Sequence, residues 1–276
     1  LTAPYRLRAE GTVGGRTYKL HSYAEAADVG GNVNITPFTD LIVANAAQQV
    51  AESYFDSSTP ADLDPAVVDA QEDALQAKLQ DVFTALGVSS AIDLLNSTFS
   101  ADHSDLDAAL DVVSIEIDPL LNVATITNLI ESTSITDSVV DTTDNDTTLA
   151  VNDSSALTGA VTDTQAIVAR FDALETAFAT GLPTQATIQN LFSTDFYEED
   201  TPIGPFLTDI TTDPSIIGLT FYGLSVSNLD STAGTATVTF NFGVNDFVDP
   251  ETDVWFAAKD PTLGWQLLGD QKIVET

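Results

Sequence analysis

The chain has 276 residues, 42 of them acidic and eight basic, which gives a formal net charge of −34. So acidic a surface repels nucleic-acid phosphates and anionic membranes, and we expect neither as a partner. The absence of cysteine excludes disulfides, thiolate metal ligands and a cysteine nucleophile. The 43% of apolar residues supply ample material for packed cores, and a chain of this length predicts two domains.

The chain contains no methionine and begins at Leu1. We therefore expect it to be a processed or excised portion of a longer precursor. No apolar run reaches the length of a membrane-spanning helix, so the sequence predicts no transmembrane segment.

The basic residues are unevenly distributed. Four of the eight lie in the opening segment, namely Arg6, Arg8, Arg16 and Lys19. A basic end on an acidic body suits head-to-tail docking between copies, so these four are our candidate assembly residues.

Residues 1–36 predict short strands. The expected strands are 5–10, 17–24 and 32–36, with a glycine turn at Gly14 and Gly15. Three strands are few for an independent sheet. Either this sheet belongs to a domain truncated upstream, or another chain completes it.

Helical segments are expected next. Thr36 and Pro37 predict an N-cap and a first helical residue, for a helix that ends near Tyr54. A second helix is predicted from Asp64 and Pro65 to a stop at Gly87, followed by a short helix over 91–96. A helix ending at Leu110 and strands over 112–117 and 123–130 complete a mixed β/α domain over residues 1–130.

Residues 131–162 are rich in Ser, Thr, Asp and Asn, and we interpret them as a linker. Asp163 is then predicted to cap a helix whose apolar residues recur on one face and which Gly181 and Pro183 terminate. Shorter helices are expected over 184–192 and 202–211.

The stretch 216–274 predicts a curled antiparallel sheet. Apolar residues occupy every second position of one strand, namely Ala236, Val238, Phe240, Phe242 and Val244. Further strands are expected over 219–229, 254–258 and 265–274, with a β-bulge at Gly223 where the apolar parity changes. The fold class is therefore α+β, with N-terminal strands and helices followed by a C-terminal antiparallel sheet that wraps around helices in residues 163–276.

Two family resemblances add to this interpretation. The order of elements over 163–276, with the closing motif Gly264–Gln271, resembles the cone-shaped nuclear transport factor fold (NTF2-like), which implies a curled sheet around a helix. Segments 18–23, 31–42 and 99–112 are similar to parts of large bacterial surface proteins and lipoproteins that follow a transthyretin-like or carboxypeptidase-regulatory-like domain. That second resemblance implies an exported, cell-surface location and no functional residues.

Histidine chemistry is limited to two residues. His103 has Asp102, Ser104 and Asp105 beside it, but sequence adjacency does not create a catalytic triad and no Gly-x-Ser-x-Gly elbow is present. We expect His103 to cap or brace a helix start, and His21 to be a half-buried strand residue. No catalytic residue and no zinc site are predicted.

Acidic loops provide oxygen ligands, so calcium is the cation considered. The candidate residues are Asp141, Asp144 and Asp146 in one loop and Glu198, Glu199 and Asp200 in another. Neither loop has EF-hand spacing, and no cofactor is assigned. Tyr222, Trp255 and Trp265 are candidate ligand-binding residues, although aromatic residues at strand spacing more often form a core.

These observations predict a non-enzymatic extracellular bacterial protein, a surface or fibre-forming subunit that assembles with copies of itself or with other surface proteins through its N-terminal strands. The alternative is a ligand- or carbohydrate-binding module, or an enzyme, that uses a cavity in the C-terminal cone.

Overall fold

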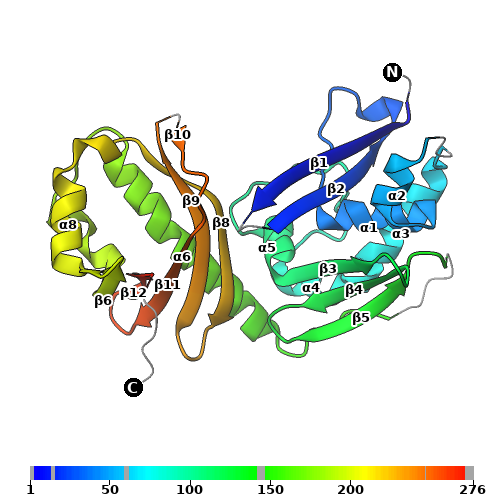
Figure 1. The fold of residues 1–276 in the computed structure, drawn as a ribbon. Coiled ribbons are helices and arrows are strands. Elements are labelled where there is room, and N and C mark those ends of the chain that lie inside the picture. The colour runs from blue at the N-terminus through cyan, green and yellow to red at the C-terminus, as the bar shows by residue number, and fades with distance from the viewer. Residues whose placement is uncertain (1–2, 14–15, 59–61, 142–146, 246, 271–276) are drawn as a thin grey trace. The chain divides into compact units, whose positions relative to one another are not determined.

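The computed structural model describes residues 3–13, 16–58, 62–141, 147–245 and 247–270 (Figure 1). The chain forms two compact units, one comprising Leu1–Gly11 and Thr17–Val161 and the other Thr12–Arg16 and Thr162–Thr276. None of the helices in these ranges combines the length and the hydrophobicity that a membrane span requires.

The first unit contains a two-stranded hairpin, a group of short helices and a three-stranded sheet. Its elements in chain order are β1 (Tyr5–Val13), β2 (Arg16–Ala24), a 3-10 turn (Ala26–Asp28), α1 (Pro37–Ala47), α2 (Ala51–Asp56), α3 (Pro65–Lys78), α4 (Gln80–Leu86), α5 (Asp105–Val112), β3 (Val113–Asp118), β4 (Val123–Asn128) and β5 (Thr133–Ser138). Residues 32–36 do not form the expected third strand, because the backbone of Asn34 bonds to the Leu95 carbonyl instead (N···O 2.7 Å).

The first predicted helix begins as expected and ends early. Thr36 is the N-cap, its hydroxyl oxygen accepts a hydrogen bond from the Thr39 N–H, and Pro37 is the first helical residue. The helix does not continue to Tyr54, because Gln48 adopts a left-handed conformation (φ 54°) and separates α1 from α2. The predicted stop at Gly87 is confirmed, with φ 77°.

The predicted linker contains ordered structure. β5 lies within it and pairs antiparallel with β4, which in turn pairs with β3. The inner face of β4 carries Ala124 and Ile126, neither of which is exposed to solvent. β5 contributes mostly Ser and Thr, so its composition resembles a linker although β-branched residues also suit a strand.

The helix predicted to start at Asp163 begins nine residues earlier. α6 (Ser154–Phe178) is capped by Asp153, whose Oδ1 accepts hydrogen bonds from the N–H groups of Ser155 and Ala156 at 3.0 Å. The boundary between the two units falls within this helix. Asp163 is therefore an interior helical residue, and it is buried.

The second unit is a mixed seven-stranded sheet packed on α6. Its other elements are α7 (Gln185–Ile188), a 3-10 turn (Gln189–Leu191), β6 (Phe192–Glu198), β7 (Thr201–Pro202), α8 (Ile203–Thr212), a 3-10 turn (Pro214–Ile216), β8 (Leu219–Asp230), β9 (Thr235–Val244), β10 (Phe247–Val248), β11 (Asp253–Asp260) and β12 (Gly264–Gly269). The strand order is β10-β9-β11-β12-β6-β7, with β8 also paired to β9.

The expectation of a curled, purely antiparallel sheet is wrong in two respects. β6 pairs parallel with β12, because residues 193–198, to which no element was assigned, enter the sheet as a strand. The sheet is also not strongly curled (Figure 1). The coarser prediction, an α+β unit with a sheet against helices, is confirmed.

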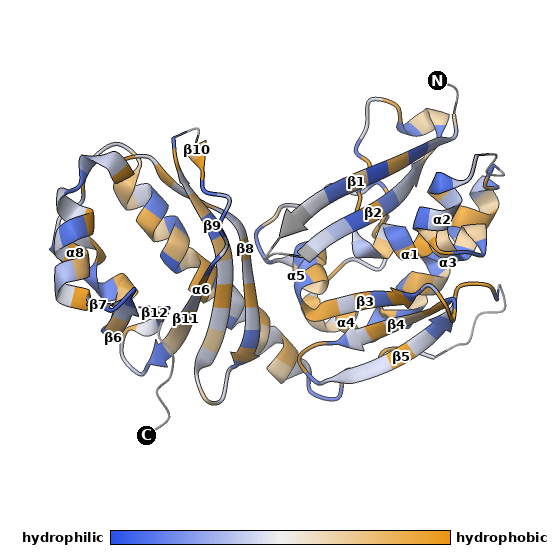
Figure 2. Cartoon of the chain, in the orientation of Figure 1, coloured by the Kyte–Doolittle hydropathy of each residue, from blue (hydrophilic) through white to orange (hydrophobic). Residues whose placement is uncertain are grey.

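The bulge predicted in β8 is present. Gly223 has φ 61°, and the register of β8 against β9 shifts between Tyr222 and Ser225. Along β9 the predicted alternation holds from Ala236 to Phe240, which are buried at every second position. It then fails at Phe242, which is 36% exposed. Figure 2 shows the alternation of apolar and polar residues along these strands.

Candidate functional site

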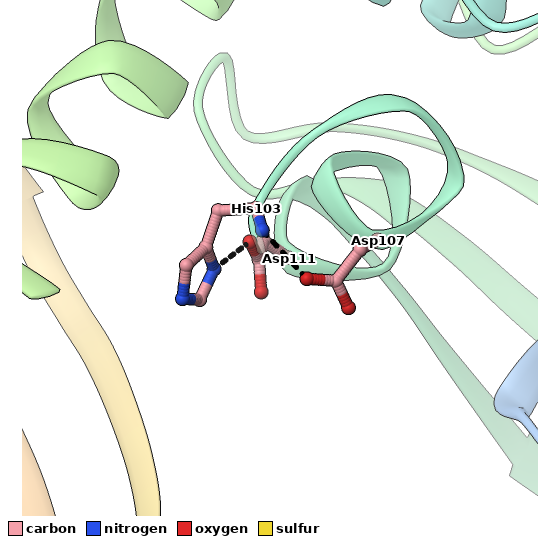
Figure 3. Close-up of side chains that lie close together, drawn as sticks. All are labelled: His103, Asp107 and Asp111. Atoms are coloured by element: carbon pink, nitrogen blue, oxygen red, sulfur yellow. Dashed lines mark hydrogen bonds and ion pairs between the residues drawn. The ribbon is translucent and has the colours of Figure 1, made fainter. Parts of the chain in front are cut away.

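The side chains of His103, Asp107 and Asp111 form a cluster of potential metal ligands along one side of α5 (Figure 3). Asp107 and Asp111 are four residues apart in α5 and share one face because a helical turn takes 3.6 residues, whereas His103 precedes the helix. The opposite face of α5 is anchored in the core by Leu106, which is 1% exposed, and by Ala109, which is not exposed. The cluster therefore lies on the outer face of a fixed helix.

Two short hydrogen bonds organise the cluster. His103 Nδ1 lies 2.6 Å from Asp111 Oδ2, and the His103 backbone N–H donates to Asp107 Oδ2 at 2.7 Å. One ligand atom from each residue lies within 4.8 Å of the other two. The imidazole is 20% exposed and the Asp111 carboxylate 33%, so the site is half-buried and open to solvent.

The local backbone holds His103 in an uncommon conformation. His103 and Asp105 have φ angles of 57° and 47°, in the left-handed region that few residues other than glycine adopt. Ser104 between them is the N-cap of α5, and Asp102 Oδ1 accepts hydrogen bonds from its backbone N–H and its hydroxyl. The turn leaves the imidazole within hydrogen-bonding distance of Asp111, eight residues later in the chain.

The charges and hydrogen bonds within the cluster change the pKa values of His103 and Asp107. The hydrogen bond to the Asp111 carboxylate raises the pKa of His103, and the negative charges of Asp111 and Asp107 add to that effect, although burial opposes it. Burial raises the pKa of Asp107, while the hydrogen bond from the His103 backbone opposes the change. The imidazole and the Asp111 carboxylate consequently form an ion pair when His103 is protonated.

The expectation that His103 braces a helix start agrees with these contacts. The sequence interpretation considered only its immediate neighbours and missed Asp107 and Asp111. The signal that could have found them was the spacing of four residues on a predicted helix.

The predicted calcium loop is only partly described. Asp144 and Asp146 lie outside the described residues. Asp141 is exposed, and its backbone N–H donates to the Ser138 carbonyl at the end of β5 (3.3 Å).

The second acidic loop forms the turn between β6 and β7. Glu199 and Asp200 have φ angles of 45° and 67°, which suits a two-residue hairpin turn. Burial, followed by the nearby charge of Asp270, raises the pKa of Glu198 to about 7. The buried Oε2 of Glu198 has no hydrogen-bond partner among the described residues.

Two of the candidate ligand-binding aromatics lie in the core of the second unit. Trp265 is 1% exposed and donates its indole N–H to Asp163. Trp255 is 8% exposed and packs with Phe171, Phe196 and other rings. Tyr222 differs, because it is 37% exposed on β8.

The candidate assembly residues face α2 of their own unit. Arg8 pairs with Asp56 at 3.1 Å and Lys19 with Glu52 at 2.8 Å. The Arg6 guanidinium lies over the rings of Tyr54 and Phe55, 5.4 and 5.7 Å from their centroids. The side chain of Arg16 lies outside the described set.

His21 is more deeply buried than expected. It is 1% exposed, its Nδ1 lies 2.7 Å from Asp40 Oδ1, and its ring centroid is 4.4 Å from that of Phe55. Its carbonyl accepts a hydrogen bond from Thr39 Oγ1, which joins β2 to α1. These contacts assign His21 to the core.

No family model, curated protein or solved structure matches this chain.

Proposed function

We propose that the chain is a non-enzymatic, extracellular structural subunit, a surface or fibre-forming protein that associates with other copies through its N-terminal hairpin. The observation that supports this most is the isolation of β1 and β2. The two strands pair with each other and, within the described part of the chain, with no further strand.

An isolated hairpin has two unpaired edges. Each edge presents backbone N–H and C=O groups that another strand can pair with, and two-stranded sheets are marginally stable alone. Addition of a strand from a neighbouring copy satisfies these groups and completes the sheet. We expect the added strand to pair with β1, because most of this strand's described residues are exposed. The exposed residues are Arg6, Arg8, Ala9, Glu10 and Gly11.

The charge layout supports association with an acidic neighbour. Residues 1–24 hold four basic residues and one acidic residue, Glu10, whereas the rest of the chain holds the other 41 acidic residues. The side chains of Arg8 and Lys19 remain 40% and 39% exposed within their ion pairs. Surface pairs of this kind contribute little to stability, so exchange for a partner on another copy costs little.

Apolar surface lies beside the hairpin. A hollow there is lined by Tyr5, Leu7, Val29 and Val33 among others, and Val29 is 68% exposed. Burial of this surface by a neighbouring copy would add a hydrophobic contribution to the backbone hydrogen bonds. The proposed extracellular location rests on the resemblance of segments 18–23, 31–42 and 99–112 to bacterial surface proteins.

The assembly can be tested with the intact chain. Sedimentation velocity and electron microscopy over a range of concentrations should show oligomers or fibres, and added salt should weaken them. A synthetic peptide of residues 4–13 should cap the edge and dissociate the assemblies, whereas a scrambled peptide of the same composition should not. A chain that stays monomeric at every concentration contradicts the proposal, as does an assembly that both peptides leave intact.

A further inference from the structure

We propose that His103, Asp107 and Asp111 bind a divalent cation of the zinc class, through one imidazole nitrogen and two carboxylate oxygens. This inference is independent of the proposed assembly, since it concerns the outer face of α5. It rests on donor type, spacing and burial within one element.

The donors are held in place before any cation binds. Asp107 and Asp111 are on an α-helix whose inner residues Leu106 and Ala109 are packed in the core. His103 is fixed by its backbone bond to Asp107 and its ring bond to Asp111. A cation would therefore bind side chains that are already ordered, and would lose little affinity to ordering them.

The distances suit a small cation. Zinc binds nitrogen and oxygen ligands at about 2.0–2.2 Å, which places tetrahedral ligand atoms about 3.4 Å apart. The ligand atoms here lie within 4.8 Å of one another, and a cation would replace the 2.6 Å hydrogen bond between His103 Nδ1 and Asp111 Oδ2 and move these two atoms apart by about 0.8 Å. Binding would require the two aspartate side chains to rotate toward the cation. A carboxylate has about four acceptor positions, so Asp107 can keep its bond to the His103 N–H while it binds the cation.

The donor set favours a zinc-class cation over calcium. Calcium takes six to eight oxygen ligands, whereas imidazole suits zinc, nickel and related metals. Three protein ligands leave at least one position for water, as in zinc sites that are open to solvent. With one of only two histidines in the chain at its centre, this cluster differs from the many acidic groups on the surface.

The test compares zinc binding by the intact chain and by two variants. His103→Asn removes the nitrogen ligand, and asparagine tolerates the left-handed backbone at this position. The control is the double variant Asp69→Asn/Asp73→Asn, which removes an exposed pair spaced by four on α3 without a histidine. Isothermal titration with Zn²⁺ should show one site in the parent and in the control, and at least about tenfold weaker binding in His103→Asn.

A second readout identifies the ligand directly. The chain has two histidines, and His21 is buried in the core. Zn²⁺ should therefore shift the ring resonances of His103 in an NMR spectrum and leave those of His21 unchanged. If His103→Asn does not fold, Asp111→Asn serves in its place, because the Asp111 carboxylate is partly exposed.

Three results would overturn the inference. One is equal zinc affinity in the parent and the His103 or Asp111 variant. Another is displacement of zinc by an equimolar amount of calcium. The last is binding in the parent that the Asp69/Asp73 control weakens to the same extent.

Discussion

Trp265 donates its indole N–H to the carboxylate of Asp163, at an Nε1–Oδ1 distance of 2.8 Å, across 102 residues of sequence. The same oxygen accepts a hydrogen bond from Lys259 Nζ at 2.7 Å. The carboxylate thus joins α6 to two neighbouring strands, β11 and β12.

The first prediction concerns this contact. Although burial opposes ionisation of Asp163, the bonds from Lys259 and Trp265 outweigh it and lower the pKa of the carboxyl. Its charged form therefore stabilises the fold at pH values above the carboxyl pKa of the unfolded chain, and this contribution is lost as the pH falls through the lower folded-state pKa. Asp163→Asn should reduce the free energy of unfolding at pH 7 by about 1.5–3 kcal/mol.

Urea denaturation followed by tryptophan fluorescence measures this loss. Asp172→Asn on the exposed face of the same helix is the control, and it should leave the free energy of unfolding within about 0.5 kcal/mol of that of the parent. Equal effects of the two substitutions would argue against a structural role for the contact.

A second prediction uses the opposite shift at Glu198. Burial raises the pKa of this carboxyl to about 7, so the folded state favours the protonated form. Stability should therefore fall as the pH rises from the unfolded-state pKa near 4.5 through about 7. Glu198→Gln should stabilise the chain by about 1–2 kcal/mol at pH 8, after allowance for solvent screening, and by little at pH 5.

Thermal unfolding at pH 5 and pH 8 distinguishes this effect from a general reduction of negative charge. The control Asp209→Asn removes an exposed charge from α8 in the same unit. A stabilisation of equal size at both pH values, or in both variants, would show that Glu198 is not the group responsible.

The sequence predicted local structure well where a short-range signal decides it. Thr36 and Pro37 start a helix, Gly87 ends one and Gly223 forms a bulge, because each depends on the conformational preference of the residue itself. The strands around β9 were also predicted, since alternation of buried and exposed residues is a property of the segment.

The errors arose where distant partners decide the structure. β5 has a linker-like composition and few apolar residues. It forms a strand because its backbone pairs with β4, and that pairing supplies stability that its side chains do not. Asp163 resembles a helix cap in sequence, but its hydrogen-bond donors, Lys259 and Trp265, lie about 100 residues away. The partners of His103 are nearer, yet they became evident only when the helix placed Asp107 and Asp111 on one face.

A third prediction tests whether β5 is structural. Asp137 on this strand accepts a hydrogen bond from Asn45 at 2.7 Å and lies 3.7 Å from the ammonium of Lys78, which is 4% exposed. Asp137→Asn removes one carboxylate that contacts the buried Lys78 ammonium and should cost about 1.5–3 kcal/mol of stability. The measurement is denaturant unfolding, with the exposed Asp81→Asn as the control. A loss below about 0.5 kcal/mol would indicate that β5 contributes little to the first unit.

A fourth prediction contrasts two glycines. Gly269 closes β12 with φ 75°, and an added Cβ would overlap the carbonyl oxygen of Tyr197 on β6. Gly269→Ala should therefore separate the parallel pair of β12 and β6 and lower the melting temperature of the chain by several degrees. Gly159 lies in α6 with open space around it, and Gly159→Ala should stabilise the chain by about 0.5–1 kcal/mol, because alanine favours the helix and restricts the unfolded state. Differential scanning calorimetry of both variants measures the two shifts, and a Gly269→Ala variant that melts with the parent would contradict the close approach of β12 to β6.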